Sequence, residues 1–158
     1  MSKTNNHSHI YTAEQVADWF LSQEAMTHKK LHKLCYYAQA WSLVLNNKPI
    51  FNNPIEAWVH GPVVKSLYPK YADYAYNLIP KACIEQNIFD KKTLKTLYFV
   101  YNAYKEFDGD DLERFTHLEA PWLEARANLA PFEPCNNEIN LQTMKSFYTQ
   151  QRKQLLSE

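Results

Sequence analysis

The segment THKKLHKLCYYAQAWSLVLNN, from Thr27 to Asn47, sets the architecture of this chain. Apolar side chains recur in it at intervals of three and four residues, and neither glycine nor proline interrupts it. This spacing predicts one long helix whose apolar stripe consists of Leu31, Leu34, Cys35, Ala38, Trp41 and Leu45. The pair Asn46-Asn47, followed by Pro49, predicts its end. We expect this helix to be the central element of the fold.

Further helices are predicted on both sides of this segment from capping residues and apolar spacing. Thr12, with Gln15 three residues later, forms a capping box for a helix that ends near Gln23. Pro62 suits the first turn of a helix over 62–74, which Pro69 kinks or divides. The remaining helices are predicted after Asp90, after a capping box of Asp110 and Glu113, on either side of Pro121, and after Asn140.

The segment KPIFNNPIEAWVHGPV is of a different kind. Two short apolar pieces flank Asn52-Asn53-Pro54, which is turn chemistry between two strands. Gly61 and Pro62 then predict a corner between a strand and a helix. The expected fold is therefore mainly α, a single compact helical domain over residues 11–158 with one small β-hairpin around residues 49–59, preceded by a flexible N-terminus of residues 1–10.

Composition narrows the function. Of 158 residues, 46% are hydrophobic and 15% aromatic, so some rings should remain at the surface as binding anchors. The net charge of zero argues against nucleic acid as a partner. The three cysteines form no CxxC pair, which indicates a reducing, cytoplasmic compartment without a structural zinc site. Neither a signal sequence nor an apolar run of the ~18 residues that span a bilayer is present, so no membrane partner is expected.

Two groups of histidines could carry chemistry. His28 and His32 have the spacing of two ligands on one helix face, but the lysines around them oppose a cation. His60, His117 and Glu119, together with Glu56, are the residue types of a hydrolase or a metal site if folding gathers them. No HExxH motif or nucleophile elbow fixes their geometry, and buried imidazoles explain them equally well. We expect no catalytic, cofactor-binding or metal-binding residues.

The segment EAPWLEAR places Arg126 four residues after Trp122. A Trp–Arg pair at this spacing can stack on a helix surface, and both residue types dominate binding hot spots. Alternatively, Trp122 fills the core and Arg126 covers it. The sequence leaves these two alternatives open.

Three segments together resemble a known family. KLCYYAQAW (33–41), PIEAWVHGPVV (54–64) and THLEAPWLEAR (116–126) are similar to the Panacea domain, the SocA-like antitoxin domain, to which the phage-associated GepA proteins belong. The resemblance covers roughly residues 12–150. It implies a mostly helical, non-enzymatic antitoxin of a type II toxin–antitoxin system, which neutralises a cognate protein toxin encoded nearby by direct binding.

The predicted partner-binding residues are Trp58, His60, Trp122 and Arg126. One alternative is a protease adaptor or phage-associated interaction protein, whose partners would include a cellular protease. A second alternative is a metal-dependent hydrolase that uses His60, His117 and Glu119. Whether the corner at Trp58, Gly61 and Pro62 supports the fold or contacts the partner stays open from sequence alone.

Overall fold

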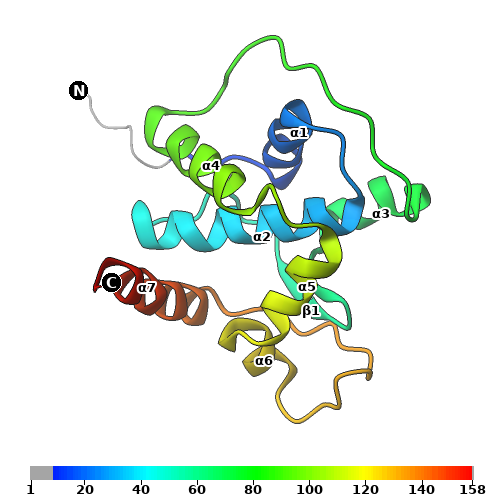
Figure 1. Ribbon diagram of the computed structural model, residues 1–158, viewed down its shortest axis with the longest axis vertical. Coiled ribbons are helices and arrows are strands. Elements are labelled where there is room, and N and C mark those ends of the chain that lie inside the picture. Colours follow the sequence, from blue (N-terminus) through cyan, green and yellow to red (C-terminus); the bar gives the residue numbers. More distant parts are fainter. Residues whose placement is uncertain (1–8, 158) are drawn as a thin grey trace.

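The computed structural model describes residues 9–157 and is mainly α-helical (Figure 1). Its α-helices are α1 (Ala13–Gln23), α2 (His28–Leu45), α3 (Tyr68–Tyr71), α4 (Lys91–Tyr104), α5 (Gly109–His117), α6 (Ala120–Arg126) and α7 (Leu141–Ser157). Strands β1 (Ile55–Trp58) and β2 (Gly61–Val64) form one antiparallel hairpin. The predicted fold class is confirmed. The predicted flexible N-terminus of residues 1–10 falls largely on residues 1–8, which lie outside the described part.

Local capping starts the helices where the sequence predicts. The Thr12 side chain accepts a hydrogen bond from the Gln15 backbone N–H at 3.1 Å, and Gln15 Oε1 accepts one from the Thr12 N–H at 2.9 Å. This reciprocal pair is the predicted capping box. The predicted helix starts are likewise capped by the side chains of Thr27, Asp90 and Asn140.

The cap of α5 differs from the prediction. Its capping box consists of Asp108 and Asp111, two residues ahead of the pair Asp110 and Glu113 that the sequence suggested. The carboxylates of Asp110 and Glu113 instead bind Lys29 on α2, at 2.8 and 2.7 Å. The two carboxylates that the local pattern assigned to the cap of α5 therefore form tertiary ion pairs instead.

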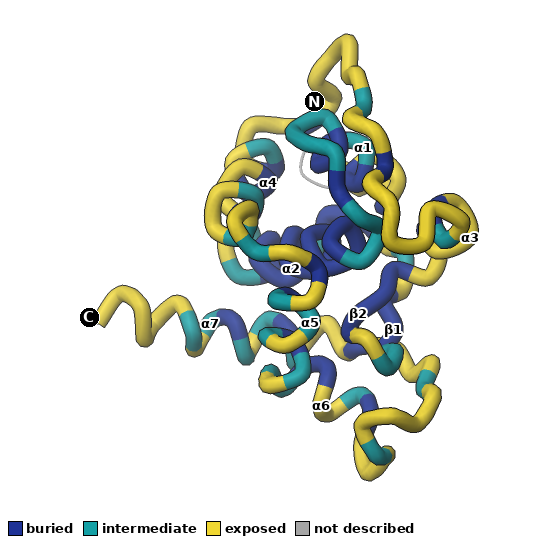
Figure 2. Tube along the Cα trace, turned by 45° about the vertical axis from the view of Figure 1, so that its right-hand side comes forward, coloured by how far each residue is buried: buried dark blue, intermediate teal, exposed yellow. Residues whose placement is uncertain are grey.

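Helix α2 is the central element, as predicted. It runs through the middle of the molecule, with α1 and α4 on one side and α5 and α7 on the other (Figure 1). The predicted stripe is buried from Leu31 to Trp41, whereas Leu45 is 37% exposed, and burial extends beyond the stripe to nearly all faces of the helix (Figure 2). Although α2 and α7 have 18 and 17 residues, none of the described helices is apolar enough to cross a membrane.

A buried amide ties the segment after α2 back onto this helix. Gln39 Oε1 accepts the Ile50 N–H at 2.8 Å, and Gln39 Nε2 donates to the Phe51 carbonyl at 2.7 Å. The Tyr11 N–H in turn donates to the Ile50 carbonyl at 2.8 Å. The apolar piece at residues 49–51 therefore pairs with the start of the described chain and is not a strand of the hairpin.

The hairpin lies later in the chain than predicted. Its strands pair Ile55 with Val64 and Trp58 with Gly61, so the turn is at residues 59–60 and not at 52–54. Asn53, which the sequence assigned to the turn, uses its side-chain oxygen to accept the Ala13 N–H at 2.9 Å. A residue with turn chemistry thus serves here as an anchor for the start of α1.

The predicted corner and helix after Gly61 are also wrong in detail. Pro62 lies in β2 opposite Ala57, whose N–H and carbonyl bond outward to Asn137 and Arg126. Because this pair exchanges no hydrogen bonds, the missing N–H of Pro62 costs the sheet nothing. The β-branched Val63 and Val64 extend the strand. The expected helix over 62–74 is reduced to α3 and two 3₁₀ turns, Lys65–Leu67 and Ala72–Tyr74.

Candidate functional site

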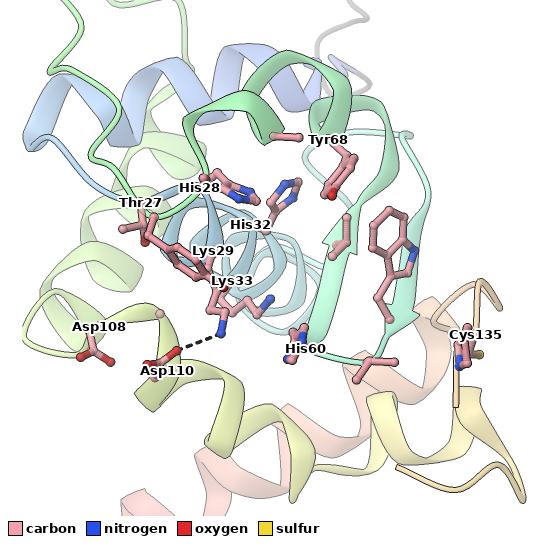
Figure 3. A pocket seen from close by; sticks show the side chains of 18 of the residues that line it. Thr27, His28, Lys29, His32, Lys33, His60, Tyr68, Asp108, Asp110 and Cys135 are labelled. Atoms are coloured by element: carbon pink, nitrogen blue, oxygen red, sulfur yellow. Dashed lines mark hydrogen bonds and ion pairs between the residues drawn. The ribbon is translucent and has the colours of Figure 1, made fainter. Parts of the chain in front are cut away.

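A cavity of about 990 Å³ opens beside the hairpin turn (Figure 3). Its base is the first half of α2, one wall is the hairpin turn and α3, and the start of α5 and the loop at residues 134–136 close the remaining sides. Helix α2 contributes the side chains of His28, Lys29, His32 and Lys33 to the lining. Their spacing of four residues places His28 with His32, and Lys29 with Lys33, on adjoining parts of one helix face.

The hairpin turn gives the cavity its aromatic wall. Trp58 is partly exposed, and its ring centroid lies 4.8 Å from that of Tyr68. The Trp58 Nε1–H donates to Glu56 Oε1 at 2.8 Å, which fixes the indole on the cavity side of the hairpin. Farther along the rim, Tyr76 is 94% exposed. Half-exposed rings around a concave surface are typical of sites that bind another molecule.

His60 lies at the tip of the turn, with 71% of its side chain exposed. Its Nδ1 is 3.1 Å from Glu113 Oε2, and Glu113 Oε1 accepts from Lys29 at 2.7 Å. Burial would raise the pKa of Glu113, but its bonds to Lys29 and His60 outweigh burial and lower that pKa. Glu113 is therefore an anion that holds the turn against α2 and α5.

Lys33 is the most unusual residue of the cavity because only 1% of it is exposed. Burial, with repulsion from Lys29, lowers the pKa of Lys33 to about 7. Figure 3 shows its side chain directed from α2 toward the turn that carries His60. Its Nζ makes no hydrogen bond or ion pair with any residue in the described part of the chain.

Gly61 is required by this lysine. Its φ of +103° is a conformation that residues with a Cβ rarely adopt, and an added Cβ would lie 2.7 Å from Lys33 Cε. The glycine therefore lets the backbone of β2 pass directly against the Lys33 side chain. This resolves the role of one of the chain's two glycines in structural terms.

The variant Gly61→Ala is expected to lower the free energy of unfolding by about 2 kcal/mol, because a Cβ is strained at this φ and crowds Lys33. Urea denaturation measures this difference. Compared with the single variant Lys33→Ala, the double variant Gly61→Ala/Lys33→Ala should lose only the free energy of the backbone strain, because the crowding is relieved in both. A single variant as stable as the unchanged protein would contradict the proposed contact between Gly61 and Lys33.

Trp122 and Arg126 lie beneath the hairpin and not on the surface. They are 3% and 2% exposed, and the guanidinium carbon is 4.8 Å from the indole centroid, so the pair stacks inside the protein, with Trp122 in the core as the second alternative had it. The Trp122 Nε1–H donates to the Trp58 carbonyl at 2.8 Å, and Arg126 donates to the Ala57 carbonyl at 2.9 Å. Both side chains therefore hold β1, whose last residue is Trp58. Their contact with a partner stays a prediction.

The residues of the predicted hydrolase are only partly brought together. His60 and His117 both approach Glu113, but Glu119 faces the opposite way and accepts hydrogen bonds from Tyr37 and Tyr148. The His117 ring stacks on Trp122, with centroids 4.0 Å apart. Within residues 9–157, no group of three His, Cys, Asp or Glu side chains is placed to hold a metal ion.

Sequence inspection missed Lys33 and Tyr68 as members of the site and considered His32 only as a possible metal ligand. Lys33 and His32 lie within a segment that reads as a buried helix, and Tyr68 lies in a segment predicted as another helix. The apolar spacing of the helix gave no signal for Lys33, because the predicted stripe does not include it, whereas the structure buries this helix on nearly all its faces. The proximity of Lys33 to Gly61 likewise follows only from the tertiary fold.

Fold and site together define a small, mainly α-helical domain with an aromatic-walled cavity beside a two-stranded hairpin. A known family, described as the antitoxin SocA-like, Panacea domain, matches residues 31–123, more than half of the chain. The chain belongs to this family. Curated proteins and solved structures gave no match. The matched range includes the cavity-lining part of α2 from His32 onward and the whole hairpin.

Proposed function

We propose that this protein is the antitoxin of a type II toxin–antitoxin system and that it neutralises a cognate protein toxin by direct binding. The observation that carries the proposal is its membership of an antitoxin-like family over residues 31–123. The gene of the toxin is expected beside that of this protein. A toxin bound in this way is a protein partner, so the proposal requires neither a cofactor nor a reaction.

The geometry supports the hairpin turn as the centre of the toxin-binding surface. Trp58 and His60 border the cavity and retain accessible surface, while Tyr76 projects from its rim. Aromatic side chains next to a concave surface supply large contact areas at a small cost in conformational entropy. An interface of ordinary size, ~1,600 Å² in total, would extend from this turn over the mouth of the cavity.

In this proposal Trp122 and Arg126 support toxin binding by holding strand β1 in place. Because they hold the carbonyls of Trp58 and Ala57, they fix the position of the turn that contacts the toxin. A rigid turn loses less entropy on binding than a mobile one, so these buried side chains contribute to affinity by fixing that turn.

Co-expression of the neighbouring gene product with this protein tests the proposal. We expect that product to inhibit growth alone and to be harmless when this protein is present. The double variant Trp58→Ala/His60→Ala should bind the toxin at least about 30-fold more weakly, the loss typical of hot-spot residues. Purified proteins and calorimetry measure this binding, and thermal unfolding verifies that the variant is folded.

Leu156→Ala is the matched control, since Leu156 is exposed near the end of α7 and does not line the cavity. Unchanged toxicity in the presence of the unaltered protein would contradict the antitoxin proposal. Equal toxin affinity of the double variant and the control would contradict the assignment of the surface. The half-life of the toxin in cells distinguishes neutralisation by binding, which leaves it unchanged, from delivery to a protease, which shortens it.

A further inference from the structure

We propose that the cavity beside the hairpin binds an acidic segment of the protein partner, with a carboxylate at Lys33 and a neighbouring apolar side chain against the aromatic wall. The inference deepens the proposed function and rests on it, because the segment is assigned to the toxin. It makes a statement about chemistry that the antitoxin proposal alone does not: the partner must present Asp, Glu or a chain-terminal carboxylate next to an apolar residue.

The first argument is the unpaired state of Lys33. Its amino group is at the end of a side chain that is 99% covered, and no carboxylate of the described residues lies within ion-pair distance. A buried amine loses solvation, and the attraction of Glu113 from beyond ion-pair distance does not offset burial and the repulsion of Lys29, so the pKa of Lys33 falls to about 7. A carboxylate in the cavity would supply the missing charge, and excluded water would strengthen the pairing.

The second argument is His32, which is 98% buried and lines the same cavity. Its Nδ1 accepts the Val64 N–H at 3.1 Å, and burial lowers the pKa of His32 to about 3. The ring is therefore neutral, and its proton is on Nε2. This Nε2–H has no acceptor among residues 9–157. Backbone carbonyls of a peptide are the acceptors that such a donor would find in a bound segment.

The acidic residues that line the cavity do not prevent it from binding a carboxylate. Asp110 is bound to Lys29 at 2.8 Å, and Asp108 accepts the Asp111 N–H at 2.8 Å as the cap of α5. Lys29 is further engaged by Glu113. Each of these charges already has a partner within the protein, so Lys33 is the cation of the lining that remains for a ligand.

The apolar wall of the cavity indicates which side chain lies next to the carboxylate in the bound segment of the partner. The rings of Trp58 and Tyr68 are tilted against each other by 56° with their centroids 4.8 Å apart, and Val63 adds apolar surface to the same lining. A volume of about 990 Å³ accommodates several side chains of a peptide and far exceeds the space that one carboxylate needs. A short extended segment with one acidic and one apolar side chain fits both the charge and the size.

Selection from a random heptapeptide library displayed on phage tests the inference without knowledge of the toxin. The full-length protein is expected to enrich peptides that carry Asp or Glu within two positions of an aromatic or large aliphatic residue. Synthetic versions of the selected peptides should bind Lys33→Met at least tenfold more weakly, as measured by calorimetry. Replacement of the acidic residue by its amide should weaken binding to the unaltered protein by a similar factor.

Two variants make the result interpretable. Lys33→Met keeps the apolar stem and removes the uncompensated charge, so it should fold and unfold at the same temperature as the original protein or a higher one. Lys95→Met, at an exposed position of α4 outside the cavity, should bind the selected peptides unchanged. Competition by the selected peptides for the toxin should be lost in Lys33→Met.

Selected peptides without acidic enrichment, or peptides that bind Lys33→Met as tightly as the original protein, would overturn the inference. So would a small organic acid that is retained in the cavity and detected by native mass spectrometry, since the ligand would then not be a protein segment. If Lys33→Met still neutralises the toxin fully, the inference fails and the antitoxin proposal stands. If the unaltered protein does not neutralise the toxin, the antitoxin proposal fails, and with it the assignment of the segment to a toxin.

Discussion

The variant Arg126→Ala is expected to lose about 3 kcal/mol of unfolding free energy, because the buried carbonyl of Ala57 and three partly buried loop carbonyls would lose their donor at once. The guanidinium donates to the carbonyls of Ala57 and Ala130, both at 2.9 Å, and also to those of Pro131 and Glu133. It therefore joins strand β1 to the loop that follows α6. An alanine would leave the buried carbonyl of Ala57 unpaired, would release the exposed loop at residues 131–134 from β1, and would uncover the Trp122 ring.

Urea denaturation followed by far-ultraviolet circular dichroism measures this loss. Arg126→Lys keeps one charge but cannot serve carbonyls in several directions, so it should recover only part of the stability. The control Arg152→Ala removes an exposed arginine from α7 and should change the unfolding free energy by less than about 0.5 kcal/mol. A loss below about 1 kcal/mol for Arg126→Ala would show that the loop supplies alternative donors, contrary to the proposed role.

The elements that could be predicted from sequence are those whose signals are local. The caps at Thr12, Thr27, Asp90 and Asn140 depend on residues three positions away, and each starts a helix where expected. The central position of α2 also followed from its long uninterrupted apolar spacing. Local patterns suffice here because helix starts are determined within one turn.

Predictions failed where a local signal served a distant contact. Asn53 looked like a turn residue, but its side chain caps no hairpin and binds the backbone of Ala13. Asp110 and Glu113 looked like a capping box, but both carboxylates form ion pairs with Lys29. In each case the residue type was interpreted correctly as a hydrogen-bond partner, and the identity of its partner depended on segments far away in the sequence.

In the candidate site, too, the residues that could be predicted from local sequence differ from those whose position depends on the tertiary fold. Trp58 and His60 were predicted as surface residues of the corner, and both line the cavity. Trp122 and Arg126 were predicted with them, and the two side chains stack, but they lie under the hairpin. A spacing of four residues indicates that two side chains meet. It does not indicate which face of a short helix is covered, because that depends on how α6 packs against β1.

The second large effect concerns pH. The free energy of unfolding is expected to fall as the pH rises from about 4.5 to about 7, because Glu119 must then ionise inside the folded protein. Burial raises the pKa of Glu119 from 4.5 to about 7, although hydrogen bonds from the hydroxyls of Tyr148 and Tyr37, at 2.7 and 3.0 Å, oppose that rise. The folded state thus binds this proton more tightly than the unfolded state does.

The sign follows from this difference. With the folded-state pKa above the unfolded one, the contribution of Glu119 is complete below pH 4.5 and is lost as the pH rises through 7. The loss is on the order of 3 kcal/mol. Lys33, whose pKa is lowered to about 7, contributes in the opposite sense: its share is lost as the pH falls through 7. A comparison of two variants at the same pH removes such background titrations.

Glu119→Gln isolates the effect, because the amide oxygen still accepts from Tyr37 and Tyr148 but carries no titrating proton. Relative to the original protein, this variant should gain about 3 kcal/mol in unfolding free energy between pH 4.5 and pH 8. Glu124→Gln, at an exposed position of α6, should show no such gain. A constant difference across this range would mean that Glu119 ionises freely. Tyr36 of α2 and Tyr148 of α7 are hydrogen-bonded to each other, and Tyr148 also donates to Glu119, the residue before α6. The constant difference would mean that this carboxylate is solvated, contrary to its burial.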